Sequence, residues 1–276
     1  MSRNKSVMLW IGASANHQAL ACKIASRVPV SEIIIERRVS KRGRNSLRYL
    51  FERVLGRSVF KPISTAWLRT QKHYACEYSS LPKTRVLEVE DIHSPIAQEF
   101  ARSSTAEVVA VSGTRLIRRS MLDESSHRQI LNLHTGLSPF VKGGPNCTNW
   151  CISQEDWHLI GNSVMWIDAG IDSGDLVATE AVPLVGTETL SELHLKVLEH
   201  GHSLYVDAIY ALWEGRAIPR VKQREMGEGV TFYSRQWNFV SKTRMLMNWP
   251  RYRDAVNSEE TRRMRDAVKT IPFEVK

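Results

Sequence analysis

Short apolar runs alternate with segments of helical spacing along most of the chain, and this alternation constrains the fold more than any other feature of the sequence. The runs cover residues 7–11, 33–35, 85–89, 107–111 and 130–133. Continuous runs rich in valine and isoleucine predict strands buried on both faces, and helices between them predict a parallel sheet. The sequence therefore predicts the α/β class with a doubly wound, mostly parallel sheet.

The helical segments carry signals of their own. Asn16 is expected to cap the first helix, whose inner positions are Leu20, Ala21, Ile24 and Val28. Further along, two strands are predicted over 163–167 and 176–182, and one long helix over 187–213. The long helix carries His194, Glu199, His200 and His202. These four residues are spread around its circumference, so they are predicted to lie on the surface rather than to bind a metal.

These elements divide the chain into unequal parts. Residues 1–215 are predicted to form one domain with a basic helical insertion at about 37–80, and residues 216–276 a small C-terminal appendage with a helix near 259–268. The stretch 37–57 holds eight lysines or arginines, and its apolar positions follow helical spacing. A solvated basic face docked on the sheet is the favoured interpretation. Binding of an anionic substrate or RNA, or of a membrane surface, stays open.

Composition excludes several classes of protein. The net charge of +9 suits anionic partners without choosing among them. Four cysteines without a Cys-x-x-Cys pair argue against a disulfide scaffold and a cysteine-rich zinc site, and indicate reduced thiols in a cytoplasmic protein. No apolar run has the ~20 residues of a transmembrane helix. The apolar run at 7–12 is interpreted as a buried strand rather than as a signal peptide.

Asn132 and His134 form the strongest candidate for chemistry. On a strand their side chains share one face, at the carboxyl edge where open α/β sheets bind ligands. An amide can stabilise an oxyanion, and an imidazole near its ordinary pKa of about 6.5 can move protons, which suits acyl transfer. Taken alone, the pair is also compatible with a histidine that bonds the backbone at the edge of the core.

The glycine-rich loop 168–175 is the second candidate, with Asp168, Asp172 and Asp175. It lacks the aspartate spacing of a calcium loop, and no metal site is predicted. The sequence also lacks a phosphate-binding P-loop, the Gly-x-Gly-x-x-Gly dinucleotide motif and the Gly-x-Ser-x-Gly elbow of hydrolases.

Taken in order, these features resemble the formyltransferase family that uses 10-formyltetrahydrofolate, which includes glycinamide ribonucleotide transformylase, methionyl-tRNA formyltransferase and the sugar N-formyltransferases. The family pattern is Asn-x-His followed by Asp-x-Gly-x-Asp-x-Gly. Here it is matched by 132–134 and 168–174, with Ser112–Ile117 and the long helix also similar. The resemblance covers about residues 7–215 and implies a Rossmann-like formyltransferase fold. Thr135 replaces the proline that follows the family's histidine, and the next loop is longer around 144–146.

Residue by residue, the resemblance implies a catalytic trio of Asn132, His134 and Asp172. It implies that the folate pocket is lined by Thr114, Arg115, Leu116, Ile117, Asp168, Ala169, Gly170 and Ile171. The implied formyl donor is 10-formyltetrahydrofolate, and no metal takes part.

The resemblance further implies a small-molecule amine as the acceptor, for which an anionic, nucleotide-linked amino sugar is the preferred hypothesis. The insertion and tail offer basic residues for its phosphates, and Phe232, Tyr233, Trp237 or Trp249 for stacking on a base or sugar. Residues 216–276 leave too little chain for the family's tRNA-binding β-barrel, which disfavours methionyl-tRNA. Glycinamide ribonucleotide, hydroxylamine and peptide acceptors stay open. So do a homodimer and a non-catalytic basic protein that binds RNA or membranes.

Overall fold

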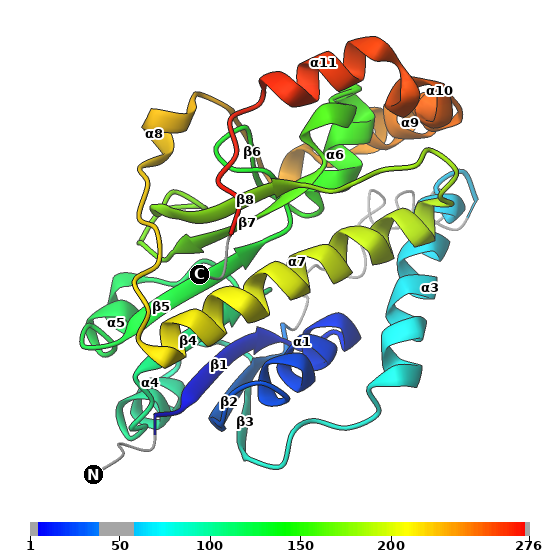
Figure 1. The fold of residues 1–276 in the computed structure, drawn as a ribbon. Helices are drawn as coiled ribbons and strands as arrows, with labels where there is room; N and C mark the ends of the chain where they lie inside the picture. The colour runs from blue at the N-terminus through cyan, green and yellow to red at the C-terminus, as the bar shows by residue number, and fades with distance from the viewer. Residues whose placement is uncertain (1–4, 39–57, 274–276) are drawn as a thin grey trace.

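The computed structural model describes residues 5–38 and 58–273 (Figure 1). Most of the predicted basic helix, residues 39–57, lies outside these ranges. A seven-stranded sheet with the strand order β3-β2-β1-β4-β5-β7-β8 forms the centre of the molecule. Its strands are β1 (Val7–Gly12), β2 (Val30–Glu36), β3 (Arg85–Val89), β4 (Val108–Ser112), β5 (Gln129–His134), β7 (Gly161–Trp166) and β8 (Leu176–Ala181).

The first five of these strands are parallel, and β7 and β8 continue the sheet antiparallel. The predicted doubly wound, mostly parallel sheet is therefore confirmed. The expectation that every run is buried on both faces is wrong for β3, where Val86 is 41% exposed. β3 is an edge strand, so its residues lack a neighbour on one side.

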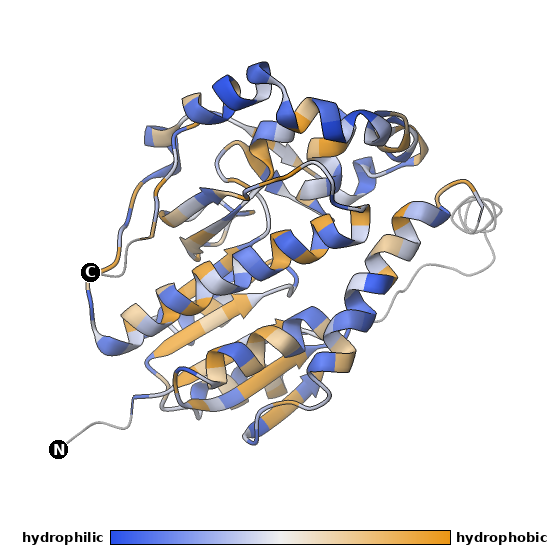
Figure 2. Ribbon diagram, turned by 45° about the vertical axis from the view of Figure 1, so that its right-hand side comes forward, coloured by the Kyte–Doolittle hydropathy of each residue, from blue (hydrophilic) through white to orange (hydrophobic). Residues whose placement is uncertain are grey.

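Alternating side chains of the central strand build two cores, one on each face of the sheet. Val7, Leu9 and Ile11 of β1 pack under α1 (Ala15–Ala25) and α7 (Leu190–Glu214). Met8 and Trp10 pack on the opposite face, under α4 (Pro95–Arg102) and α5 (Arg119–Asp123). The strands are accordingly orange in Figure 2 and are covered by helices whose hydrophilic residues are blue. This three-layer arrangement follows from the period of two along a strand.

The long helix α7 begins with a capping box made by Thr189 and Glu192 and ends at Gly215, whose φ is +83°. Its placement overturns one prediction, because His194 and His202 are only 2% and 1% exposed. Helix α7 packs on the sheet beside α1 and also contacts α3 (Lys61–Glu77), so it is buried on more than one side. The predicted cap of the first helix is also wrong. Helix α1 follows Ser14, and Asn16 is buried within its first turn.

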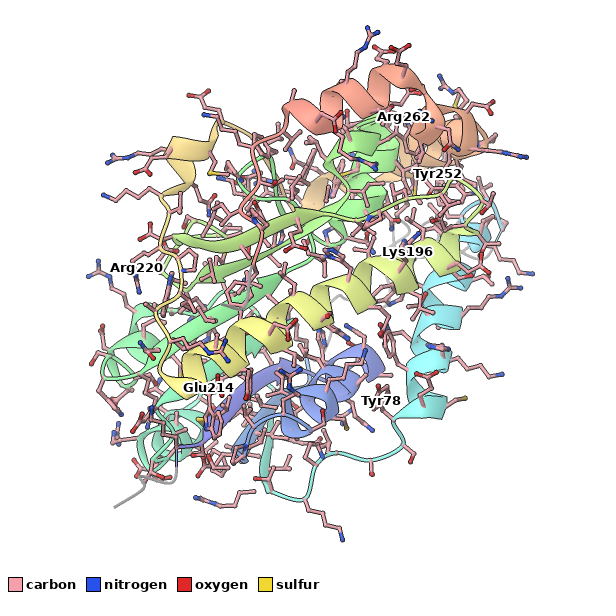
Figure 3. All side chains as sticks on the ribbon, in the orientation of Figure 1. Tyr78, Lys196, Glu214, Arg220, Tyr252 and Arg262 are labelled. Carbon is pink, nitrogen blue, oxygen red and sulfur yellow. The ribbon has the colours of Figure 1, made fainter. Side chains whose placement is uncertain are left out.

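Residues 216–273 pack closely on the elements that precede them. Helix α9 (Phe239–Asn248) contacts α6 (Cys147–Gln154), and the short strand β9 (Val230–Phe232) pairs with β6 (Val141–Gly143). Lys196 of α7 and Tyr252 of α10 (Tyr252–Asn257) both bind Glu188, at 2.7 and 3.0 Å (Figure 3). The predicted boundary at residue 215 and the predicted insertion at about 37–80 both stay predictions.

The remaining elements lie partly in this region and partly before it. They are α8 (Gln223–Met226) and α11 (Glu259–Ala267), with three short 3-10 helices over Trp157–Leu159, Ser234–Gln236 and Trp249–Arg251. The helix expected near 259–268 corresponds to α11. All four cysteines are free. Within the described ranges every helix is too short or too polar to cross a bilayer.

Candidate active site

The three polar side chains singled out in the sequence converge at the carboxyl end of β5. Asn132 Nδ2 lies 3.4 Å from Asp172 Oδ1, and His134 Nδ1 lies 3.4 Å from Asp172 Oδ2. Asn132 and His134 share one face of β5 because side chains alternate along a strand. Asp172 comes from the loop that joins β7 to β8. The structure thus brings an amide, an imidazole and a carboxylate together from positions up to forty residues apart in the chain.

Asp172 is held in place by the backbone around it. The backbone N–H of Gly143 donates to the Asp172 Oδ2 at 3.0 Å, and the side-chain Nε2 of Gln223 donates to the Asp172 carbonyl oxygen at 2.7 Å. Its own φ of +46° is unusual for a residue with a side chain. Gly143 has a φ of +84°, and a Cβ there would clash with the backbone oxygen of Phe232. The β6–β9 pairing therefore positions the carboxylate.

His134 is buried, and the atoms around its ring favour the charged form. Its Nε2 lies 3.2 Å from the carbonyl oxygen of Val141 and 3.5 Å from Cys147 Sγ. Burial alone would lower the pKa of His134, but the Asp172 carboxylate, with Cys147 and Val141, raises it to about 10. The expectation that this histidine titrates near neutral pH is therefore wrong. At neutral pH His134 carries a positive charge between Val141 and Asp172.

A cavity of about 380 Å³ opens on one side of the trio. We call it the loop cavity, because residues 114–117, after β4, and 166–168 with 170–174, after β7, line most of it. Seven of the eight residues predicted to line a folate pocket lie here, and Ala169 does not. Leu116 and Ile171 are 47% and 40% exposed. Two loops thus present uncovered apolar side chains and backbone to this cavity.

Two of the predicted lining residues use their charged groups to stabilise the loops themselves. The Asp168 carboxylate accepts hydrogen bonds from the Gly170 N–H at 2.9 Å and from the Ser173 hydroxyl at 2.8 Å. The Arg115 guanidinium lies 2.9 Å from Asp91 and 2.5 Å from Glu36. The Arg115 charge is therefore paired with two carboxylates, and the Asp168 carboxylate is hydrogen-bonded by neutral donors of its own loop.

Glu36 is a residue that sequence reasoning missed. Burial would raise its pKa, but hydrogen bonds from the N–H groups of Arg115 and Ile92 and from the Arg38 side chain hold it below the ordinary value. The carboxylate therefore anchors the start of the 114–117 loop. A glutamate directly after Ile33–Ile35, at the carboxyl end of a buried strand, is the signal that could have found it.

Gln223 and Cys147 were missed as well. The partners of Gln223, Asp172 and Gly174, lie about fifty residues earlier in the chain, and no local pattern marks such a contact. Cys147 touches His134 only because residues 135–146 fold back on β5. Both residues belong to the support of the trio.

A second cavity of about 390 Å³ opens on the other side of the trio. We call it the histidine cavity, because the buried side chains of His194 and His202 and the half-buried His17 line it together with Trp67. Thr135 and residues 143–146, where the sequence departs from the family pattern, also line it. Asn132, Asp172 and Arg38 line both cavities. The two cavities therefore meet at the trio.

The aromatic residues of the tail divide into two groups. Phe232 and Tyr233 line the loop cavity. Trp237 and Trp249 are used in packing, since Trp237 lies edge-on against Trp150 and Trp249 stacks on Tyr252. In residues 5–38 and 58–273 no three histidine, cysteine, aspartate or glutamate side chains are grouped as metal ligands.

Comparison with known proteins gives one family. The sequence model described as formyl transferase matches residues 68–209, just over half of the chain. The methionyl-tRNA formyltransferase of Clostridium botulinum (strain Alaska E43 / Type E3) is 31% identical over 142 residues, which are 51% of this chain and 42% of that protein. The chain spans less than half the length of the curated relatives that it matches.

Solved structures share the fold at low sequence identity. A sugar N-formyltransferase from Shewanella sp FDAARGOS_354 gives a TM-score of 0.55 at 12% identity, covering 90% of this chain and 88% of that one. An N-formyltransferase from Helicobacter canadensis, solved in complex with folinic acid and dTDP-3-aminofucose, gives 0.54 at 14% identity and covers 88% and 80%. These likenesses establish a common architecture.

Proposed function

Because the chain belongs to the formyl transferase family, we propose that it transfers a formyl group from 10-formyltetrahydrofolate to a primary amine, and that the amine is carried by a nucleotide-linked amino sugar. One observation carries this proposal: Asn132, His134 and Asp172 meet where two cavities of similar size join. A transfer reaction needs such a junction, since its two substrates must approach one reactive carbon from different sides.

The loop cavity fits the formyl donor. A flat heterocycle needs apolar contacts on its faces, and Leu116 and Ile171 are left exposed there. The Arg115 charge is paired with carboxylates and the Asp168 carboxylate is hydrogen-bonded within its own loop, so the polar groups of both side chains are engaged before a ligand binds. The donor supplies a formyl group attached to a nitrogen that can leave.

The trio has a distinct role for each side chain. The Asn132 amide and the positively charged His134 stabilise the negative charge that develops on the formyl oxygen. Asp172 faces both side chains and is the carboxylate placed to take up the proton that the attacking amine loses. His134 is the protonated group beside the reaction centre that can supply a proton to the departing nitrogen. Its raised pKa makes it an electrostatic and acidic partner rather than a base.

An anionic amino sugar suits the histidine cavity and its mouth. Arg38 lines both cavities with about half of its side chain exposed, and provides a positive charge for a phosphate. A fold neighbour was solved with dTDP-3-aminofucose, an amino-sugar nucleotide. Methionyl-tRNA is the second candidate acceptor, because the curated relatives carry that name. Cytoplasmic location and a homodimer stay predictions.

The direct test is an assay with 10-formyltetrahydrofolate and a panel of acceptors that contains amino-sugar nucleotides, glycinamide ribonucleotide and methionyl-tRNA. We expect formylation of an amino-sugar nucleotide. Transfer only to methionyl-tRNA or glycinamide ribonucleotide would replace the acceptor and keep the reaction.

Ligand-dependent melting separates the enzyme from a non-catalytic alternative. Folinic acid is expected to raise the melting temperature, since a ligand at 100 times its Kd stabilises the folded state by about 2.7 kcal/mol. A protein that only binds RNA or lipid responds to polyanions with steep salt dependence. Absence of any folate response would overturn the proposed reaction.

A further inference from the structure

His194 holds a buried nitrogen with no partner. Its side chain lines the histidine cavity, and the residue is 2% exposed. The Nε2 atom lies 2.8 Å from the Asn149 carbonyl oxygen Oδ1. The Nδ1 atom has no hydrogen-bond partner among the residues that the structure describes. Most buried polar atoms of folded proteins are paired, so an unpaired nitrogen on a side chain that lines a cavity marks a place where a ligand atom could bind.

The surroundings of the His194 ring determine whether the ligand atom donates or accepts this hydrogen bond. Burial lowers the pKa of His194 to about 4, so the imidazole is neutral at pH 7 and carries a single proton. A carbonyl oxygen can only accept a hydrogen bond, so the contact with Asn149 assigns that proton to Nε2. The remaining Nδ1 therefore presents a lone pair and requires a donor.

Besides the charged side chains at the junction with the loop cavity, the cavity wall holds an aromatic ring and other uncharged groups. Trp67 lies edge-on to His194, with ring centroids 5.8 Å apart, and lines the same cavity. The His17 Nδ1 is already paired with the Ser14 hydroxyl at 2.8 Å. Burial also lowers the pKa of His17, to about 4, so this side chain adds no charge at pH 7. Neutral hydrogen-bonding groups beside an aromatic ring suit a ring that carries hydroxyl groups.

We propose that His194 Nδ1 accepts a hydrogen bond from a hydroxyl of the acceptor, beside Trp67, and thereby selects a hydroxylated amine over an apolar one. This inference rests on the proposed function and adds the atom that recognises the sugar. It separates two tasks within one acceptor: charge is bound near Arg38, and the sugar ring is recognised by neutral groups. A site built around a buried acceptor atom disfavours ligands without the matching hydroxyl, because the atom would stay unpaired.

Nitrogen NMR of the protein with 15N-labelled histidine tests the atom directly. The free protein at pH 7 should show His194 protonated on Nε2 and not on Nδ1. Addition of dTDP-3-aminofucose or UDP-glucosamine should shift the Nδ1 resonance, whereas cyclohexylamine, which lacks hydroxyls, should not. A proton on Nδ1 in the free protein, or no response to either sugar nucleotide, would overturn the inference.

Variants supply a second measurement. His194→Leu removes the acceptor atom and is expected to raise the KM of the amino-sugar acceptor about tenfold, as for the loss of one buried hydrogen bond, with the KM of the donor unchanged. His194→Gln keeps an amide oxygen and should restore most of the affinity. His200→Leu is the matched control, because His200 lies on the same helix outside the cavity and contacts Glu180 at 3.3 Å. Equal KM values in all three variants would contradict the role.

The result is distinguishable from failure of the proposed function. If folinic acid raises the melting temperature but the sugar nucleotides do not shift the His194 Nδ1 resonance, the proposed reaction is retained and the recognition role of His194 is wrong. If folinic acid has no effect and no acceptor is formylated, the proposed function itself is wrong.

Discussion

The loop cavity and the histidine cavity meet at the same three side chains but are built in different ways. The loop cavity is made largely by two short loops at strand ends, in which Arg115 is paired with acidic residues and Asp168 accepts hydrogen bonds from its own loop. The histidine cavity shares the loops around the trio, but its far wall is formed by helices α1, α3 and α7, which contribute uncharged imidazoles and an indole.

The difference separates a general task from a particular one. On the proposed function, the formyl donor binds in the loop cavity, which short segments at two strand ends provide. The acceptor binds in the histidine cavity, whose wall includes side chains that helix packing brings together. The two cavities should therefore respond differently to substitution and to pH.

The largest expected effect is at the junction itself. Asn132→Ala should lower turnover about 100- to 1,000-fold, because one donor to an oxyanion is lost, while the fold is retained. Steady-state kinetics measure the turnover, and circular dichroism measures whether the fold is retained. Asn257→Ala, at the end of α10, is the control and should behave as the parent protein. Near-normal turnover of the Asn132 variant would contradict its role.

The second prediction concerns the charge of His134. A raised folded-state pKa means that the imidazolium persists as the pH rises and is lost only near the folded value of about 10. We expect kcat/KM to stay level with respect to this group from pH 7 to 9 and then to fall about tenfold per pH unit above 10. NMR titration of the His134 ring gives the same midpoint independently. A midpoint near 6.5 would restore the role of a neutral base.

The third prediction concerns the support of Asp172. Gly143→Ala forces a left-handed φ on a residue with a side chain and drives its Cβ against Phe232, so the β6–β9 pairing should break. We expect a loss of about 1–3 kcal/mol in the free energy of unfolding and at least a tenfold lower turnover. Gly144→Ala is a close control, since nothing lies within 4 Å of the position that its Cβ would take. Urea denaturation of both variants measures the free energy of unfolding, and an equal loss in the two would contradict the prediction.

The smallest expected effect is a loss of folding stability at acidic pH that comes from His194 in the histidine cavity. His194 has a pKa of about 4 when folded, below its ordinary 6.5, so the unfolded chain binds protons first as the pH falls. Folding stability is then lost between pH 6.5 and 4. His194→Gln should remove about 1–2 kcal/mol of this fall between pH 7 and 5, measured by urea denaturation at both values. The exposed His127→Gln should leave the fall unchanged.

The sequence predicted the loop cavity better than the histidine cavity, and the reason is physical. Thr114–Ile117 and Asp168–Ile171 are contiguous segments next to strands, so the resemblance to the formyltransferase pattern was enough to group them, and all of them except Ala169 line this cavity. Asn132 and His134 likewise share a face by simple alternation. The burial of His194 depends on α3 packing over α7, a contact between residues more than a hundred positions apart, and helical periodicity alone assigned it to the surface.

Electrostatics was the other point that local reasoning missed. An isolated histidine has a pKa near 6.5. The value for His134 is set by Asp172, which is 38 positions away and meets the ring only in the folded chain. Glu36 and Gln223 act in the same indirect way, since each holds a loop that carries other residues.

The most direct test of the central claim, that each cavity takes one substrate and that both meet at the trio, is a crystal structure of the protein with folinic acid. We predict the pterin ring between residues 114–117 and 168–171, the formyl oxygen within hydrogen-bond distance of Asn132 Nδ2, and the histidine cavity free of the folate. A folate bound in the histidine cavity, or one whose formyl group lies away from Asn132 and His134, would contradict the account.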